Sequence, residues 1–242
     1  DEMAHRTYTF FKKMVSKYGD KACLFGQGPA YGIQETILFS LGFEKMPVWI
    51  RREKDLVRRF IARNEELCFK TNMALIDAGI PVVLQTDDFA FKSGPLMNPK
   101  LIDELFGEPY RRIIRAVHDR GAKYVLHSCG DNTLLFDTFI SWGVDGLHAY
   151  EMTSNVDIFR EKQLHGDKVT MIGGVGVDYL LTDRSKDEEV AAEVKRLIEG
   201  LGPGGRYILS PVHSLSSIPA GKLRVMLDAA RTYGAYPISV SS

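Results

Sequence analysis

The stretch KYVLHSCGDNTLLFDTFISWGVDGLHAYE, from Lys123 to Glu151, predicts two strands with one helix between them. YVL is a short apolar run of the kind that forms buried strands, and DGLHA predicts the second strand. The segment from Thr133 to Trp142 predicts a helix that ends at Gly143. A strand–helix–strand unit with short turns is typical of two parallel strands in one sheet covered by helices.

The same alternation continues on both sides of this stretch. A helix predicted over Glu53–Ala78 precedes the strand PVVLQTD, and SKDE (Ser185–Glu188) predicts a capping box that opens a later helix. Six strands are expected in all, starting near Ala22, Pro81, Lys123, Asp145, Lys168 and Arg206. This α/β pattern is typical of a (β/α)8 TIM barrel or an open doubly wound sheet. Because a closed barrel needs eight strands, we expect one domain over residues 1–242 that lacks its N-terminal strands.

Composition excludes several classes of partner. The chain has 242 residues, 45% of them hydrophobic, with 31 basic and 31 acidic side chains, so no basic field attracts nucleic acid. No apolar stretch approaches the roughly 20 residues that cross a membrane, and DEMAHRTYTF lacks the apolar core of a signal peptide. The three cysteines are widely spaced and odd in number, which predicts a reducing, cytoplasmic setting.

Potential metal ligands follow the predicted strands. His127 and Cys129 are two residues apart at a strand end, so imidazole and thiolate are expected on the same side. Nitrogen and sulfur are the donors that zinc prefers. Alternatively, Cys129 is a buried cysteine beside a hydrogen-bonded histidine. His213, in SPVHSLSSIP, follows the last predicted strand and would reach the same rim of a barrel, or is a surface or helix-capping histidine.

Carboxylates occupy the same kind of position. Glu151 follows DGLHA, where it is either a ligand or a carboxylate at the rim. Asp87 and Asp88 follow PVVLQT, and successive strand residues point in opposite directions, so one of them would face the cavity as a general acid or base. The alternative for this pair is a helix cap or a partner for an arginine.

Four motifs occur in a recognisable order: QTDDFAFKSGPLMNP, VLHSCGDNTLLFDTFISWGVDGLHAYE, KVTMIGGVGV and GGRYILSPVHSLSSIP. On these motifs the chain resembles the uroporphyrinogen decarboxylase (URO-D) superfamily, nearest to its cobalamin-dependent methyltransferase branch. The resemblance implies a (β/α)8 barrel with Zn2+ on His127, Cys129 and a third ligand in the last strand's loop. Methyltransferases that act on thiols carry cysteine at that third position, and this chain carries His213. Glu151 matches a glutamate that approaches the metal.

The resemblance further implies methyl transfer between a small-molecule donor or acceptor and a corrinoid (cobalamin) held by a partner protein. Asp87, Asp88 and Glu151 are then the expected catalytic residues. One alternative is a metal-free decarboxylase in which Asp87 or Asp88 handles the proton. Another is a truncated homologue without activity, and a homodimer also stays open.

Overall fold

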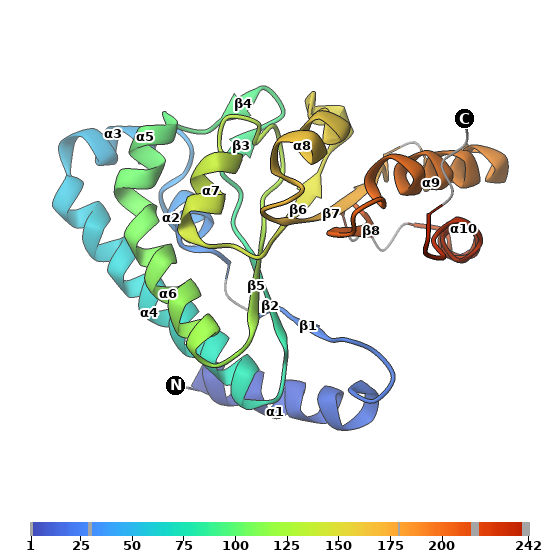
Figure 1. The fold of residues 1–242 in the computed structure, drawn as a ribbon. Coiled ribbons are helices and arrows are strands. Elements are labelled where there is room, and N and C mark those ends of the chain that lie inside the picture. Colours follow the sequence, from blue (N-terminus) through green and yellow to red (C-terminus); the bar gives the residue numbers. More distant parts are fainter. Residues whose placement is uncertain (1, 29–30, 179, 214–217, 239–242) are drawn as a thin grey trace. The chain divides into compact units, whose positions relative to one another are not determined.

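The computed structural model describes residues 2–28, 31–178, 180–213 and 218–238. The chain divides into two compact units, Asp1–Asp145 and Gly146–Ser242. Parallel strands that alternate with helices make up the framework of both units (Figure 1). None of the helices in the described residues is both long enough and apolar enough to cross a membrane.

The first unit contains a three-stranded parallel sheet. Its strands β1 (Phe25–Gly26), β2 (Val82–Thr86) and β5 (Lys123–His127) lie in that order, with β2 in the centre. A two-stranded hairpin, β3 (Ala90–Phe91) and β4 (Gly94–Pro95), follows β2. The helices of this unit are α1 (Glu2–Tyr18), α2 (Ile33–Leu41), α3 (Lys45–Arg52), α4 (Lys54–Asp77), α5 (Pro99–Ile102), α6 (Glu108–Asp119) and α7 (Phe136–Trp142). The long helix α4 packs against α1, α2 and α6 and lies beside α6 in Figure 1.

An aromatic cluster anchors the chain just after β2. Phe89 is fully buried, and its ring centroid lies between 5.3 and 6.2 Å from those of four other aromatic residues. These four are Phe106, Tyr110, Phe139 and Trp142, contributed by the segment before α6, by α6 and by α7. Because Phe89 directly follows Asp88, the cluster fixes the position at which the two aspartates leave the sheet.

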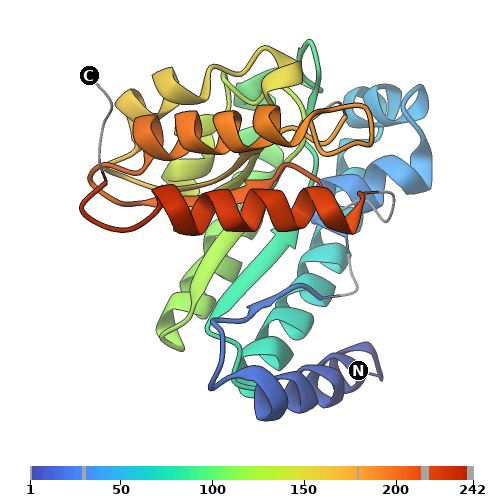
Figure 2. The ribbon, with the colours of Figure 1, turned by 90° about the vertical axis from the view of Figure 1, so that its right-hand side faces the viewer.

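The second unit contains three further parallel strands. Strands β6 (Gly146–Tyr150), β7 (Thr170–Val175) and β8 (Tyr207–Pro211) lie in sequence order, and Gly173 is paired with both Tyr150 and Leu209. Its helices are α8 (Ile158–His165), α9 (Asp187–Leu201) and α10 (Ala220–Tyr233). Helix α9 packs against α10, which lies beside it in Figure 2, and against β7 and β8. Parallel strands with covering helices are the α/β arrangement that the sequence predicts.

The elements agree with the sequence prediction except at some boundaries. All six predicted strands are present, and the helix expected over Glu53–Ala78 is α4. The helix expected from Thr133 begins at Phe136. The capping box predicted at Ser185–Glu188 is wrong by one residue, because the Lys186 N–H donates to Oε2 of Glu189 at 2.7 Å. The Ser185 hydroxyl donates instead to backbone carbonyls that precede it. Closure into a barrel and the single domain stay predictions.

The Phe89→Ala variant tests the aromatic anchor. Removing a fully buried ring leaves a cavity among four aromatic neighbours, so we expect the free energy of unfolding to fall by about 3–5 kcal/mol. Phe69→Ala is the matched control, because this ring is 41% exposed, and it should cost less than about 1 kcal/mol. Urea unfolding followed by circular dichroism measures both. Equal losses of unfolding free energy in the two variants would contradict the anchoring role of the aromatic cluster.

Candidate functional site

In the first unit, the ends of β2 and β5 lie side by side. Thr86 is in register with His127, and the Asp87 N–H donates to the carbonyl oxygen of His127 at 2.9 Å. The two aspartates that follow β2 therefore leave the sheet next to the H-x-C motif that follows β5. In parallel α/β folds this carboxyl edge is where functional residues collect.

His127 and Cys129 face each other. Nε2 of His127 lies 3.1 Å from Sγ of Cys129. The intervening Ser128 is buried on the other side, where its hydroxyl accepts from the Phe89 N–H and donates to Oδ1 of Asn132. Ser128 therefore faces away from the His127–Cys129 pair. Tetrahedral zinc would hold the nitrogen and sulfur about 3.5 Å apart, so the pair fits such an ion after a shift of a few tenths of an ångström.

The loop that carries Cys129 is held rigidly. Nδ2 of Asn132 donates to the carbonyl oxygens of Ser128, Cys129 and Gly130 at 2.9, 3.0 and 3.2 Å. Gly130 has φ +87°, and a Cβ there would lie 2.6 Å from the carbonyl oxygen of Ala90 in the hairpin. Only glycine combines this backbone conformation with so close a neighbour. The thiol is therefore positioned before any ligand arrives.

Asp87 points away from this pair and caps α2. Its fully buried carboxylate accepts from the backbone N–H groups of Gln34 and Glu35 at 3.0 and 2.7 Å, and from the Tyr110 hydroxyl at 2.5 Å. Burial raises the pKa of Asp87 to about 8 and outweighs these three hydrogen bonds, which lower it. The structure thus places Asp87 in the capping position that the sequence left open as an alternative.

Asp88 points toward the H-x-C motif. Its Oδ1 accepts from the Cys129 N–H at 2.7 Å and lies 4.0 Å from Nε2 of His127. The opposite orientations of Asp87 and Asp88 are those that strand alternation predicts. Of the two predicted acid–base residues, Asp88 is therefore the one next to the candidate metal ligands.

Glu35, in the first turn of α2, is a residue that the sequence analysis missed. Its side chain is buried and accepts a hydrogen bond from the backbone N–H of Asp88. Burial, and secondly the nearby charge of Asp88, raise the pKa of Glu35 to about 7. A carboxyl group with this pKa can exchange a proton near neutral pH. One weak signal in the sequence is its position after the first predicted strand, which is only two residues long in the structure.

The second unit brings together Glu151 and His213. Glu151 directly follows β6 and is 4% exposed, and its Oε1 accepts from the Thr153 hydroxyl at 2.6 Å. Its Oε2 lies 3.8 Å from Nε2 of His213, just beyond the end of β8. His148 lies within β6, where its Nε2 donates to the carbonyl oxygen of Pro211 at 3.2 Å. Burial is the main reason that the pKa of His148 is lowered, which favours the neutral imidazole.

The predicted site residues therefore form one group in each unit. His127, Cys129 and Asp88 are together in the first, and Glu151 and His213 in the second. Each group stands at the carboxyl ends of its own parallel strands, as the sequence predicts. That the groups share one metal ion stays a prediction.

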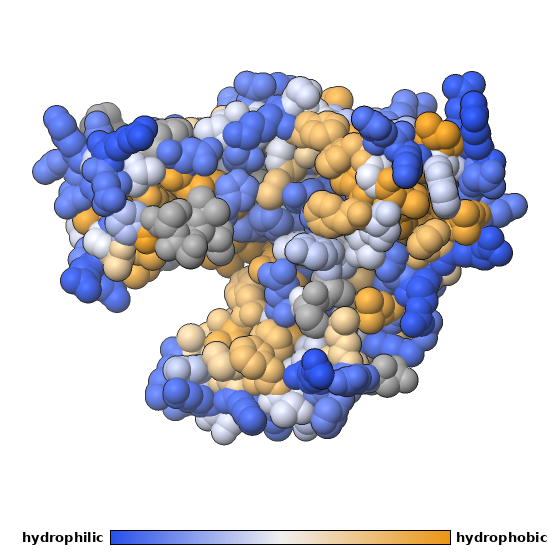
Figure 3. All heavy atoms as spheres, turned by 180° about the vertical axis from the view of Figure 1, so that it is seen from behind, coloured by the Kyte–Doolittle hydropathy of each residue, from blue (hydrophilic) through white to orange (hydrophobic). Residues whose placement is uncertain are grey.

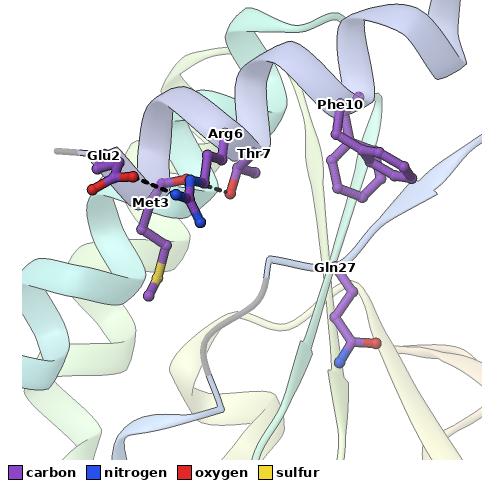
Figure 4. A pocket seen from close by; sticks show the side chains of 7 residues that line it. Glu2, Met3, Arg6, Thr7, Phe10 and Gln27 are labelled. Carbon is purple, nitrogen blue, oxygen red and sulfur yellow. Dashed lines mark hydrogen bonds and ion pairs between the residues drawn. The ribbon is translucent and has the colours of Figure 1, made fainter.

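A cavity of about 680 Å3 also lies in the first unit, but it has different chemistry. Figure 4 shows side chains of α1 and Gln27 around it, and the lower part of Figure 3 shows hydrophobic residues gathered where α1 lies. Met3, Phe10 and Phe11 are the apolar residues of its lining. None of the predicted site residues lines this cavity, so it is not the candidate catalytic centre.

Comparison with known proteins identifies the family. Residues 36–233 match the family described as Uroporphyrinogen decarboxylase (URO-D). The chain therefore belongs to the URO-D family, as its motifs predict. None of the curated proteins matches the chain.

Solved structures share the fold. A methyltransferase from Methanosarcina mazei aligns with a TM-score of 0.79 at 19% identity, over 95% of this chain and 64% of its own. A B12-independent methionine synthase from Shewanella sp. W3-18-1, in complex with selenomethionine, gives a TM-score of 0.55 at 12% identity and covers 72% of this chain and 53% of its own. A sugar phosphate isomerase/epimerase from Parabacteroides distasonis gives 0.52 at 12% identity, with 96% and 77% covered. The chain thus spans less than two thirds of the methyltransferase's length.

The raised pKa of Glu35 predicts how the stability of the fold depends on pH. Its pKa is higher in the folded chain than its usual 4.5, so the unfolded chain releases this proton first and stability falls as pH rises from about 4.5 through 7. In Glu35→Gln the free energy of unfolding should therefore fall less over this pH range, by up to about 3 kcal/mol. The exposed Glu188→Gln is the control and should leave the pH dependence unchanged. Urea unfolding at intervals between pH 5 and 8 measures it, and identical slopes for Glu35→Gln and wild type would refute the assignment.

Proposed function

We propose that this chain belongs to a zinc-dependent methyltransferase that moves a methyl group between a small molecule and a corrinoid carried by a partner protein. His127, Cys129 and His213 would hold the ion, and Glu151 would be a fourth ligand that substrate displaces. The observation that carries the proposal is the His127–Cys129 pair, with nitrogen and sulfur 3.1 Å apart at a strand end. Membership of the URO-D family and the methyltransferase fold support it.

The chemistry follows from the donor set. Bound zinc would act as a Lewis acid on the heteroatom that carries or receives the methyl group. One thiolate with two neutral imidazoles leaves more positive charge on the ion than two thiolates would, which favours a methylated or methoxylated small molecule over a free thiol as substrate. Asp88 holds the Cys129 amide, and so keeps the thiolate oriented toward His127.

Glu35 would carry protons for the site that these ligands form. Glu35 accepts from the backbone of Asp88 and has a pKa of about 7, so it can take up or release a proton at neutral pH. Asp88 lies between Glu35 and the H-x-C motif. The pair would therefore balance the charge that develops on a leaving group.

Zinc binding is the direct test. After reconstitution with Zn2+ and removal of excess ion, we expect about one equivalent of zinc in wild type and an affinity lowered at least about tenfold in Cys129→Ser, because a thiolate donor is lost. Cys23→Ser, at an exposed cysteine, is the matched control and should bind as wild type does. Metal analysis and competition with a chromogenic chelator give the values.

His213→Ala separates two versions of the site. If the ion is shared between the two groups of residues, this variant also loses affinity at least about tenfold. Full affinity in His213→Ala, with loss in Cys129→Ser, would reject His213 as third ligand. A wild-type protein that stays empty after reconstitution would reject the zinc site altogether.

A metal-free decarboxylase is the second candidate. The observation in its favour is the buried Glu35 next to Asp88, since a carboxyl group that is partly protonated near pH 7 can donate the proton that replaces carbon dioxide. This candidate predicts turnover of a porphyrinogen or related polycarboxylate that survives chelator and falls at least about a hundredfold in Glu35→Gln. Activity that chelator abolishes would exclude it.

A further inference from the structure

The side chain of Gln34 is buried without hydrogen-bond partners among the described residues. The residue is 0% exposed, and neither Nε2 nor Oε1 of its amide is satisfied. Its backbone N–H, by contrast, donates to Oδ2 of Asp87. Buried polar atoms are almost always paired, because leaving one unpaired destabilises the fold. A ligand that forms hydrogen bonds with this unpaired amide, in the first turn of α2, would therefore stabilise the fold.

Gln34 belongs to the lining of a small cavity whose other walls are apolar. The cavity has a volume of about 130 Å3 and is walled by Leu38, Met46, Leu96 and Met97. Methionine walls adapt to occupants of different shape. A lone water molecule would be poorly held there, since ordered buried water needs two to four polar partners and the lining side chains offer only the Gln34 amide.

Two aromatic rings flank the cavity. Phe43 and Phe91 also belong to its lining, and their ring centroids are 5.5 Å apart with an interplanar angle of 31°. These rings are 54% and 48% exposed. The two rings contact each other and form one partly exposed apolar wall, along which an apolar molecule can approach the cavity.

We propose that this cavity binds a small, mostly apolar molecule through a lactam, primary amide or carboxylic acid group that pairs with the amide of Gln34. A carboxamide presents a C=O acceptor and an N–H donor side by side, and its best partner offers the complementary pair. An apolar cavity of about 150 Å3 accommodates benzene, so a ring of about six atoms suits this volume. All the lining residues lie between Gln34 and Met97, so none of the candidate metal ligands belongs to this cavity and binding there needs no metal. It therefore goes beyond the proposed methyl transfer and does not depend on it.

The cavity shares a structural element with the candidate metal ligands. Phe91 belongs to the β3–β4 hairpin, and its carbonyl oxygen accepts from the Asp131 N–H at 2.8 Å in the loop that follows Cys129. A bound molecule that displaces Phe91 would therefore also displace the backbone of Asp131, two residues from the Cys129 thiol. Binding here can be measured separately from catalysis.

Titration of metal-free protein with 2-piperidone tests the proposal. This six-membered lactam carries N–H and C=O on one edge, whereas cyclohexanone has the same ring size without the N–H donor. We expect saturable binding of 2-piperidone with a Kd on the order of 1–10 mM and cyclohexanone weaker by about tenfold or more. Calorimetry and amide NMR shifts at α2 and the hairpin give both values. Equal affinities, or no binding of the lactam, would overturn the proposal.

Gln34→Met assigns the preference to the amide. The variant keeps the length of the side chain, so it should lose the preference for 2-piperidone over cyclohexanone. In the absence of probe its thermal midpoint should rise, because an unsatisfied amide is replaced by an apolar group. Gln163→Met, at an exposed glutamine, is the control and should change neither property. A preserved preference, or a lowered midpoint in Gln34→Met, would show a structural amide and refute the ligand site.

Discussion

The buried carboxylate of Asp87 is the joint on which the first unit depends. It holds the start of α2 and the Tyr110 hydroxyl of α6 against the end of β2. The positive end of the α2 dipole and two backbone N–H groups supply what water would otherwise give this carboxylate. Gly32 makes the joint possible, since a Cβ there would lie 2.1 Å from Asp87. Three elements far apart in the sequence are thereby fixed at one point.

Two functional consequences follow from that joint. Because Asp87 points toward α2, its neighbour Asp88 must point the other way, where it holds the Cys129 amide. Because the joint also fixes the first turn of α2, Glu35 reaches the Asp88 backbone and the Gln34 amide is held in an apolar cavity. The acid–base group and the cavity amide are thus adjacent residues positioned by one carboxylate. A local substitution at the joint would disturb both.

The sequence predicts the parts of this arrangement that local chemistry determines. β-branched runs and glycine stops locate the six strands, and the H-x-C spacing orients His127 and Cys129. The alternation rule separates the roles of Asp87 and Asp88. It does not say which of them caps a helix, because the helix in question begins more than 50 residues earlier. Ser185 shows the same limit at short range, since its hydroxyl bonds back to the preceding turn and the cap moves to Lys186.

Glu35 and Gln34 escape local reasoning for a related reason. β1 is two residues long, so it marks the start of α2 only weakly, and nothing in GIQETILF shows that its polar residues are buried. Their burial comes from contacts with the segment after β2 and with the hairpin. Long-range packing, rather than periodicity, makes these residues chemically distinctive.

The geometry in the second unit restricts how Glu151 can act. Histidine ligands usually donate the N–H of their second ring nitrogen to a carboxylate, a backbone carbonyl or water, which leaves the metal-facing nitrogen free. Here the carboxylate faces Nε2 of His213, with Oε2 at 3.8 Å. If this nitrogen is the one that binds zinc, Glu151 stands beside the ion as a competing donor rather than behind the imidazole. An anionic donor in that position would lower the positive charge of Zn2+, and a neutral substrate that displaced it would meet a more electrophilic centre.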